Sequence, residues 1–290
     1  MSDTVLLLDA DIFCFQIASS VEQEIDWGDD LWTLHSDLAE AKAKLEDTVQ
    51  HLMRKLEADE AILCFTDGEN FRKKVYPDYK GNRKDVRKPL AYKELVAYCK
   101  ETYETFTRPN LEADDVMGIL ATWPKFRPGK KKVIVSEDKD LKTIGGAWLF
   151  NPKKDDEPRY NDPDEAFRYF LEQTLTGDTT DGYPGCPGIG ADTAKELLAN
   201  PYGWEQYEHV FKSGPRKDQA EMRWRKREVS DVWEAIVDQF LKAGLSEEAA
   251  LQQARCARIL HASDFNFKTK EPILWTPARA PKNASNSSTS

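Results

Sequence analysis

The sequence predicts an α/β protein in which helices flank a mainly parallel sheet. Short apolar runs alternate along the chain with longer segments of helical periodicity, which is the pattern of strands joined by helical crossovers. Three of the apolar runs lead within a few residues into acidic side chains. With 290 residues, of which 40% are hydrophobic, the chain can bury a sizeable core.

The first half of the chain supplies the predicted strands. Val5 to Leu8 is an apolar run that ends at Asp9 and predicts a buried strand. Two more strands are expected over 61–65 and 133–135, and helices over 38–56, 113–122 and 164–175. Because ligands bind at the carboxyl ends of parallel strands, we expect the acids that follow these strands to meet there.

The second half, from about Gly177, has a different character. Residues 182–190 are rich in Gly and Pro, and a short helix is expected over 191–198. Residues 204–260 are predicted to be helical, with Ser246 as a helix N-cap. Residues 276–290 lack large apolar side chains and are expected to be disordered. The predicted organisation is a core over 1–176, a helical region over 177–275 and a tail over 276–290.

The composition excludes several classes of protein. No run of about 18 apolar residues is present, so no transmembrane helix is predicted. The first residues lack the basic and apolar regions of a signal peptide. Five cysteines without a C-x-x-C pair argue against a zinc ribbon or a disulfide framework. We therefore expect a cytoplasmic protein with no membrane partner.

Charge is segregated along the chain, although the net charge is -10. Residues 70–100 contain ten Lys and Arg against three Asp and Glu, and residues 212–227 contain seven against two. Basic segments beside an acidic site fit a protein that grips phosphates near a metal centre. Two solvated basic loops on an acidic protein are the alternative.

Five acidic clusters recur at predicted strand ends or helix starts. They are Asp9/Asp11, Asp67, Glu112/Asp114/Asp115, Asp138/Asp140 and Asp178/Asp181. Mg²⁺ prefers such oxygen ligands, and two ions roughly 4 Å apart can activate a water and stabilise the leaving oxygen in phosphodiester hydrolysis. Each acid alone also fits a cap or a turn, and Asp11 is interpreted as a cap more readily than as a ligand.

No competing chemistry stands out in the sequence. The four histidines are isolated, and there is no G-x-S-x-G elbow, Walker A loop or G-x-G-x-x-G after a strand. Metal-assisted hydrolysis is therefore the favoured reaction class.

Two segments predict contacts with nucleic acid. Residues 71–84 interleave aromatic with basic side chains, among them Arg72, Lys80 and Arg83, which suit phosphates and unpaired bases. Residues 184–195 form a Pro- and Gly-rich turn that leads into a helix, where Gly188, Gly190 and Lys195 would meet a phosphate. A further basic run, 223–227, fits a surface helix and a DNA contact equally well.

The chain resembles the structure-specific 5′ nuclease family, which includes flap endonucleases and 5′→3′ exonucleases, and it looks most similar to the exonucleases of short-tailed lytic phages. The phrases that carry the resemblance are Leu8-Asp-Ala-Asp-Ile-Phe-Cys-Phe-Gln16, Phe65-Thr-Asp67, Tyr79-Lys-Gly-Asn-Arg83, Leu111-Glu-Ala-Asp-Asp-Val-Met-Gly118, Ser136-Glu-Asp-Lys-Asp-Leu141 and Gly177-Asp-Thr-Thr-Asp-Gly-Tyr-Pro-Gly-Cys-Pro-Gly-Ile-Gly190. They stand in the family's order from residue 5 to about 200.

The resemblance implies a PIN-like core with a helical arch at about 70–105 and a helix–three-turn–helix motif that binds duplex DNA. It implies a metal centre near the scissile phosphate, formed by Asp9, Asp67, Glu112, Asp114, Asp138 and Asp140. Asp115, Asp178 and Asp181 would complete a second metal's surroundings. It also implies that Lys80 and Arg83 meet the scissile phosphate, and that Gly188, Gly190 and Lys195 grip DNA.

The implied cofactors are two Mg²⁺ ions, with Mn²⁺ as a substitute, and K⁺ at the helix–three-turn–helix motif. The implied substrates are duplex DNA with 5′ ends or flaps and RNA–DNA hybrids, during phage replication, primer removal and host DNA degradation. The implied setting is the host cytoplasm. A monomer is expected, with single-stranded DNA-binding protein as a candidate partner.

Two departures from the family pattern stand in the sequence. Glu137 replaces the Gly of many members, and Pro184, Cys186 and Pro187 replace other residues of the hairpin. Neither removes a predicted ligand. Two other hypotheses stay open, a non-catalytic junction-binding protein and a PIN-type ribonuclease; the first leaves the acids without a purpose and the second leaves residues 184–195 without one.

Overall fold

The computed structural model describes residues 3–83 and 86–278, and the chain forms two compact units. The first unit contains residues up to Phe170 together with Arg258–Ile273, and the second contains Leu171–Ala257 and the residues from Leu274 onward. The chain therefore leaves the first unit and returns to it near its end. This return was not predicted, because residues 258–273 were assigned to the second region. The predicted tail lies mostly outside the described residues.

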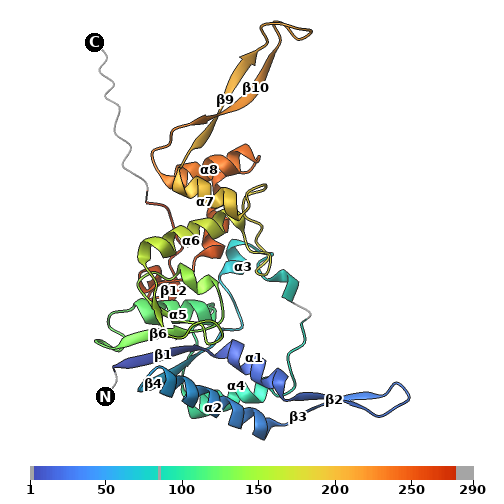
Figure 1. Cartoon of the computed structure of the whole chain (residues 1–290), viewed down its shortest axis with the longest axis vertical. Helices are drawn as coiled ribbons and strands as arrows, with labels where there is room; N and C mark the ends of the chain where they lie inside the picture. The colour runs from blue at the N-terminus through green and yellow to red at the C-terminus, as the bar shows by residue number, and fades with distance from the viewer. Residues whose placement is uncertain (1–2, 84–85, 279–290) are drawn as a thin grey trace. The chain divides into compact units, whose positions relative to one another are not determined.

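The first unit is built on a six-stranded sheet in the order β5-β4-β1-β6-β7-β8 (Figure 1). All neighbours are parallel except β7 and β8, which are antiparallel. The strands are β1 (Thr4–Asp9), β4 (Glu60–Cys64), β5 (Glu104–Phe106), β6 (Lys131–Val135), β7 (Trp148–Phe150) and β8 (Arg159–Tyr160). The predicted α/β class with a mainly parallel sheet is confirmed.

Helices cover both faces of this sheet, so the central strand β1 is apolar throughout. Val5 and Leu7 point into one core, which includes residues of α5 (Ala113–Thr122). Leu6 and Leu8 point into the other core. That core is formed with α1 (Ala10–Ser20), α2 (Leu38–Lys55) and α4 (Tyr92–Thr102).

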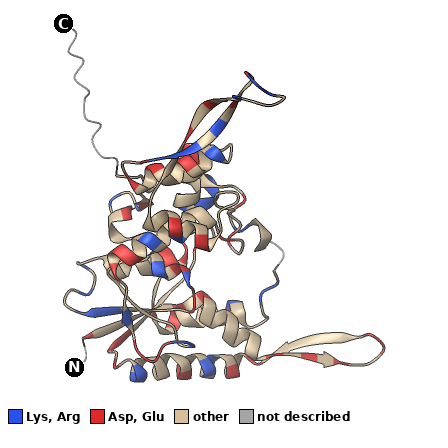
Figure 2. Cartoon of the chain, turned by 45° about the horizontal axis from the view of Figure 1, so that its top comes forward, with Lys and Arg blue, Asp and Glu red and all other residues tan. Residues whose placement is uncertain are grey.

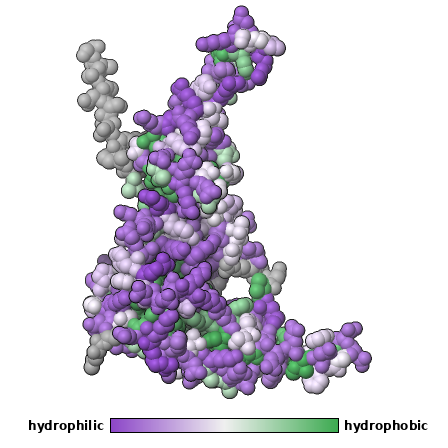
Figure 3. Space-filling view, in the orientation of Figure 1, coloured by the Kyte–Doolittle hydropathy of each residue, from purple (hydrophilic) through white to green (hydrophobic). Residues whose placement is uncertain are grey.

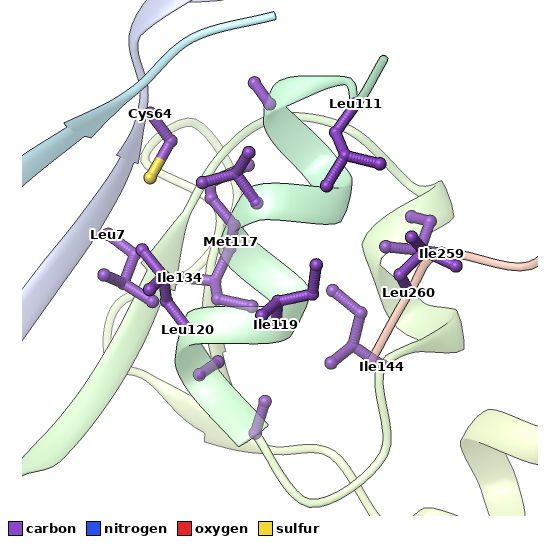
Figure 4. Close-up of a cluster of buried hydrophobic side chains, with 14 of the residues drawn as sticks. Leu7, Cys64, Leu111, Met117, Ile119, Leu120, Ile134, Ile144, Ile259 and Leu260 are labelled. Carbon is purple, nitrogen blue, oxygen red and sulfur yellow. The ribbon is translucent and has the colours of Figure 1, made fainter. Parts of the chain in front are cut away.

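The returning segment packs on α5 inside the first unit. It contains η3 (Ala262–Asp264), β11 (Phe265–Asn266) and β12 (Glu271–Pro272). Figure 4 shows Ile259 and Leu260 beside Ile119 and Ile144 in the buried cluster around α5. Residues far apart in sequence therefore seal the helix on which two predicted ligands lie.

A hairpin of β2 (Glu22–Asp26) and β3 (Trp32–Ser36) extends from the first unit and was not predicted. Its tip exposes Trp27, Leu31 and Trp32, which are 58–64% exposed. In the space-filling view, green apolar atoms mark this hairpin at the lower right (Figure 3). The shorter elements of the first unit are α3 (Arg72–Val75), η1 (Gly81–Arg83) and η2 (Asp140–Thr143).

The second unit contains the end of α6 (Pro163–Thr176), then α7 (Ala191–Ala199), a β-ribbon and two further helices. The ribbon pairs β9 (Gly203–Val210) with β10 (Ala220–Arg227) in antiparallel register. The helices are α8 (Val232–Lys242) and α9 (Glu247–Ala257), and the Ser246 hydroxyl accepts a hydrogen bond from the backbone N–H of Ala249 as predicted for an N-cap.

The prediction of helix over 204–260 is thus wrong for the ribbon and right for α8 and α9. The ribbon forms because both of its arms contain aromatic residues, and because Gly214-Pro215 supplies a turn between them. Within the described part of the chain, no helix combines the length and the apolar character that a membrane span requires.

Gly118 lies where α5 meets the returning segment. A Cβ at this position would stand 2.4 Å from the backbone oxygen of Leu260, too close for any side chain. We predict that Gly118→Ala lowers the free energy of unfolding by about 1–3 kcal/mol, because α5 and the returning segment must separate. Urea unfolding followed by circular dichroism measures this value.

The matched control for this substitution is Gly81→Ala, whose added Cβ would meet no atom within 4 Å. In an uncrowded helix, Ala is more favourable than Gly by up to about 1 kcal/mol. An increase in stability for Gly118→Ala would therefore contradict the packing described here.

Candidate active site

A pocket of about 630 Å³ opens at the carboxyl ends of β1, β4 and β6 in the first unit. Its acidic lining comes from the residues that follow these strands and from the start of α5. The carboxylates among its described lining residues are Asp9, Asp11, Asp67, Glu69, Glu112, Asp114 and Asp138. Five of the predicted ligands therefore lie around one pocket.

Asp9 is the last residue of β1 and also caps α1. Its Oδ1 accepts a hydrogen bond of 3.3 Å from the backbone N–H of Ile12, and its Oδ2 accepts one of 2.7 Å from the Ser136 hydroxyl. Ser136 directly follows β6. The neighbouring strands β1 and β6 thereby hold the Asp9 carboxylate at the floor of the pocket.

Asp11 joins three elements around the pocket. Its Oδ2 accepts a hydrogen bond of 2.8 Å from the backbone N–H of Thr66, and its Oδ1 accepts one of 3.0 Å from the hydroxyl of Tyr92. These bonds connect the start of α1 to the loop after β4 and to α4. The interpretation of Asp11 as structural is consistent with these contacts, although Asp9, and not Asp11, is the residue that caps α1.

Asp67 and Asp138 are held by the backbone of their own loops. Asp67 accepts a hydrogen bond of 2.9 Å from the N–H of Asn110, and this bond is the main cause of its lowered pKa. Asp138 Oδ1 accepts one of 2.8 Å from the N–H of Asp140. Asp140 begins η2, and it is not among the described residues that line the pocket.

Two of the pocket carboxylates, Asp9 and Asp114, have raised pKa values. Burial is the main cause that raises the pKa of Asp9 to about 7; the hydrogen bond from Ser136 opposes this shift, and the charges of Asp11 and Asp138 add to it. Burial and then the charges of Asp9 and Asp138 raise the pKa of Asp114 well above its ordinary value. Asp9, Asp114 and Asp138 therefore form a site with an excess of negative charge.

This donor set fits a hard divalent cation, which would supply the missing positive charge and prefers carboxylate oxygens. In the described part of the chain, no group of three or more Asp, Glu, His or Cys side chains is already arranged to hold a metal ion. The hydrogen bonds explain this, because the oxygens of Asp9, Asp67 and Glu112 are held by donors of the protein.

Glu112 has the opposite electrostatic surroundings to Asp9. Its Oε1 lies 2.5 Å from the Nζ of Lys80, and its Oε2 accepts hydrogen bonds from Tyr79 and Arg72. Burial works to raise the pKa of Glu112, but the charges of Lys80 and Arg72 outweigh it and hold the pKa at about 2. Lys80, whose backbone is left-handed with φ 53°, thus brings a cation to the rim of the pocket.

Arg72 and Asp115 form a buried ion pair beneath the pocket. The two guanidinium nitrogens of Arg72 each lie 2.7 Å from one oxygen of Asp115, whose side chain is fully buried. Arg72 also donates to the carbonyl of Arg258 at 2.6 Å, and Asp115 accepts from the N–H of Leu260 at 3.1 Å. The pair therefore joins α3, the start of α5 and the returning segment.

This arrangement corrects the expectation that Arg72 contacts DNA, because its side chain is only 2% exposed and pairs with Asp115 and Glu112. Asp115 is not among the described residues that line the pocket, and both of its oxygens accept hydrogen bonds. Arg83 ends η1, and its side chain lies outside the described residues. Its predicted role stays a prediction.

Asp178 and Asp181 belong to a tight turn of the second unit. The Oδ1 atom of Asp178 accepts hydrogen bonds from the N–H groups of Thr180 and Asp181 at 2.7 and 3.2 Å. The turn closes where Gly177 approaches Gly185, and a Cβ on Gly185 would stand 2.3 Å from the Gly177 nitrogen. The role of both acids as metal ligands stays a prediction.

The predicted DNA-gripping residues lie around the start of α7 in the second unit. Gly188 has a φ of 79°, and Gly190 is the N-cap of α7, which no side chain caps. Lys195 is 64% exposed, with its Nζ 3.9 Å from Glu172. The exposed N–H groups of this helix start and the Lys195 ammonium suit a phosphate, so the prediction is consistent with the local structure.

Several polar residues of the pocket were not predicted individually. They are Asn70, Lys73, Lys88, Tyr92 and Lys100. All belong to the basic stretch 70–100, whose charge was noted, but its pattern alone did not say which cations face the acids. Ser136 was not predicted to have a role of its own, and its hydrogen bond to Asp9 gives it a positioning role.

Comparisons with known proteins identify the relatives of the chain. Residues 4–155 match the family described as 5′-3′ exonuclease, N-terminal resolvase-like domain. The chain is 36% identical to the exodeoxyribonuclease of Enterobacteria phage T3 and 37% identical to the exonuclease of Escherichia phage T7. Each alignment covers 94% of this chain and 93% of the relative.

The fold is also similar to solved structures. A structure of the T5 5′-exonuclease with bound divalent zinc ions aligns with a TM-score of 0.52 and 19% identity, over 68% of this chain and 74% of that one. This likeness supports the predicted PIN-like architecture of the sheet and its flanking helices.

The Arg72–Asp115 pair generates a prediction for stability. Removal of one partner leaves a buried charge without compensation, so Arg72→Met is expected to lower the free energy of unfolding by about 3–5 kcal/mol. Urea unfolding followed by Trp fluorescence measures the loss. Lys74→Met, on the exposed side of the same short helix, is the matched control and should change stability by no more than about 0.5 kcal/mol. Equal stability of the two variants would contradict a structural role for Arg72.

Proposed function

The chain belongs to the 5′-3′ exonuclease family, and from this membership we propose that it is a divalent-metal-dependent nuclease that hydrolyses DNA phosphodiesters at 5′ ends and 5′ flaps. The enzyme class and the nuclease activity follow from the family and from the near full-length similarity to two phage exonucleases. The ions, the substrates and the residue roles given below are proposals.

One observation carries the proposal. Asp9, Asp114 and Asp138 gather in one pocket, where burial and neighbouring carboxylates raise the pKa of Asp9 and Asp114, while Lys80 stands at the same pocket. A carboxylate cluster of this kind binds a cation, and a cation with an adjacent ammonium attracts a phosphate group. A junction-binding protein without catalysis would gain nothing from carboxylates that repel DNA.

We propose that Asp9, Asp67, Glu112, Asp114 and Asp138 hold Mg²⁺, which Mn²⁺ can replace. Asp140, whose backbone N–H donates to Asp138, is proposed as a further ligand. Two bound ions supply a water nucleophile of lowered pKa and stabilisation of the leaving oxygen. Asp178 and Asp181 complete the surroundings of the second ion in this proposal. The T5 5′-exonuclease, which has a similar fold, has divalent zinc ions bound.

The protein's own residues position the substrate and stabilise charge. Lys80 would move from Glu112 to a phosphate oxygen and stabilise the negative charge that develops there, with Arg83 beside it. Ser136 and Ile12 keep Asp9 oriented, and Tyr92 keeps Asp11 oriented, so these groups act through the acids that they hold.

DNA binding is proposed to extend to the second unit. The start of α7, with Gly188 and Gly190 before it and Lys195 one turn inside, would bind the phosphates of the duplex, with K⁺ between backbone and phosphate. Within this proposal a monomer acts on duplex ends, flaps and RNA–DNA hybrids in the host cytoplasm during phage replication. A single-stranded DNA-binding protein is a candidate partner.

The decisive experiment compares substrates that carry a 5′ label. Blunt duplex, 5′-flap DNA, an RNA–DNA hybrid and single-stranded RNA are incubated with the protein in Mg²⁺ or in EDTA. We expect Mg²⁺-dependent products from the duplex and the flap, whose lengths separate exonuclease from endonuclease action. Products from single-stranded RNA alone would favour a PIN-type ribonuclease, and no product from any substrate would refute nuclease activity.

Asp138 supplies the first prediction for activity. Asp138→Asn keeps the size of the side chain but removes a charge from the Asp9–Asp114–Asp138 group, so kcat should fall about 100-fold or more. DNA affinity measured in EDTA should not decrease. The control is Glu137→Gln, since Glu137 pairs with Lys153 and does not line the acidic pocket as far as it is described. Equal losses for both variants would count against Asp138 as a ligand.

The second prediction for activity concerns Lys80. Lys80→Met should lower kcat about 10²–10³-fold, because a cation that stabilises developing charge is lost. The Mg²⁺ concentration for half-maximal rate should not rise, since Glu112 no longer pairs with an ammonium and stays available to the ion. Lys93→Met, on the exposed side of α4, is the control. A higher Mg²⁺ requirement with unchanged kcat would contradict the role assigned to Lys80.

A further inference from the structure

The β9–β10 ribbon of the second unit has no role in the proposed catalytic site. Eight residue pairs join its strands, from Gly203–Arg227 at the base to Val210–Ala220 near the turn. At about 3.3 Å per residue, each strand is roughly 26 Å long. Lys and Arg are abundant along β10 and at the turn, drawn in blue in Figure 2.

The base of the ribbon is anchored to α8. The backbone N–H of Trp204 donates to Asp238 and its indole N–H donates to Gln239, both at 2.8 Å. Arg227 pairs with Glu234 at 2.8 Å and with Asp238 at 2.7 Å. The buried Gly203 adds close packing, because a Cβ there would stand 2.1 Å from Asp238. These contacts fix the orientation of the ribbon on its helix.

One face of the ribbon carries guanidinium groups over aromatic rings. Arg225 lies over Tyr207 at 5.3 Å from the ring centroid, and Arg223 and Arg216 lie over Phe211 at 5.2 and 4.1 Å. The rings hold the cations in place without neutralising them. Arginines two residues apart on β10 are separated by about 6.6 Å. This spacing is about twice the 3.4 Å axial rise per phosphate of one DNA strand.

The carboxylates that contact these arginines are exposed. Glu221 lies 2.5 Å from Arg223, and Glu205 lies 2.6 Å from Arg225, with about 40% of each acid in solvent. Surface ion pairs of this kind contribute only about 0–1 kcal/mol, so a phosphate can replace the carboxylate at little cost.

The turn of the ribbon is basic and contains no acid between residues 212 and 217. Lys212, Arg216 and Lys217 are exposed there. The opposite face of the ribbon exposes Val210 and Met222, at 45% and 59%, together with Trp224 at 36%. The ribbon thus combines a cationic face and tip with a row of exposed apolar side chains.

We propose that the β9–β10 ribbon binds the duplex part of the DNA substrate, with its basic turn on the phosphates and its strands in the major groove. The major groove of B-DNA is wide enough for a two-stranded ribbon, and thymine methyl groups there accept apolar contacts of the kind that Met222 and Trp224 offer. This proposal rests on the proposed function for its ligand, and it places a second grip on DNA beyond the start of α7.

The test measures binding without cleavage. The affinity of the full chain for a blunt duplex and for a single strand of equal length is measured in EDTA by fluorescence anisotropy, over a series of salt concentrations. Lys212→Ala/Arg216→Ala/Lys217→Ala removes the basic tip. The matched control removes three exposed lysines from loops of the first unit, Lys125→Ala/Lys268→Ala/Lys270→Ala.

For the tip variant we expect duplex affinity to fall roughly tenfold or more at moderate salt, with a salt slope smaller by about 2–3. The slope for the control should change by less than 1. Trp224→Ser should weaken duplex binding and leave the slope unchanged, because it removes apolar contact and no charge. Circular dichroism confirms that each variant is folded.

Three results would overturn the inference. They are an unchanged duplex affinity of the tip variant, a loss no larger than that of the control, and a loss confined to the single strand. The nuclease proposal is tested separately by Mg²⁺-dependent cleavage with the unaltered chain. Cleavage with normal binding by the tip variant refutes only the ribbon, and ribbon-dependent binding without cleavage refutes only the nuclease activity.

Discussion

The buried ion pair between Arg72 and Asp115 is the interaction on which the acidic pocket depends. Arg72 neutralises the buried Asp115 carboxylate at the start of α5, and its guanidinium also contacts Glu112 and the carbonyl of Arg258. Glu112 and Asp114 belong to the same first turn of α5 as Asp115, so the anchoring of this turn also positions them. The backbone N–H of Leu260, in the returning segment, donates a further hydrogen bond to Asp115. Because α3, the returning segment and its own capping contacts hold the start of α5 in place, this helix start can keep several carboxylates close together despite their mutual repulsion.

The pocket itself divides its acids by their surroundings. Lys80 and Arg72 hold the pKa of Glu112 at about 2, whereas burial and the like charges nearby raise that of Asp9 to about 7. Glu112 is ionised and already paired with Lys80, whereas Asp9 has no cationic side chain among the causes of its shift. An ion that binds to Asp9 and Asp114 would offset the negative charge that raises the pKa of Asp114.

Much of the fold and the floor of the site could be predicted, because both depend on local patterns. Apolar runs of strand length mark β1, β4 and β6, and the acids that follow them must meet at one edge of a parallel sheet. Arg72 could not be assigned in this way, since a basic triplet looks the same whether it is solvated or sealed by residues 186 positions later. The ribbon was missed for another reason. Its aromatic residues recur at spacings compatible with a helix, although the Gly214-Pro215 turn between them contradicts one.

The net charge of -10 does not oppose DNA binding once charge is assigned to elements. The segment from Glu22 to Asp37, which forms the β2–β3 hairpin and the cap of α2, contains only acidic charges, and the pocket contains another group of them. The ribbon turn contains three basic residues and one acidic residue, Asp218. A phosphate chain is therefore repelled by some elements and attracted by others, so the sum over the chain says little about affinity, whereas the distribution restricts where DNA can lie. In the acidic pocket, where phosphate should be repelled most strongly, a bound divalent cation would reverse the local field and allow a phosphate to approach.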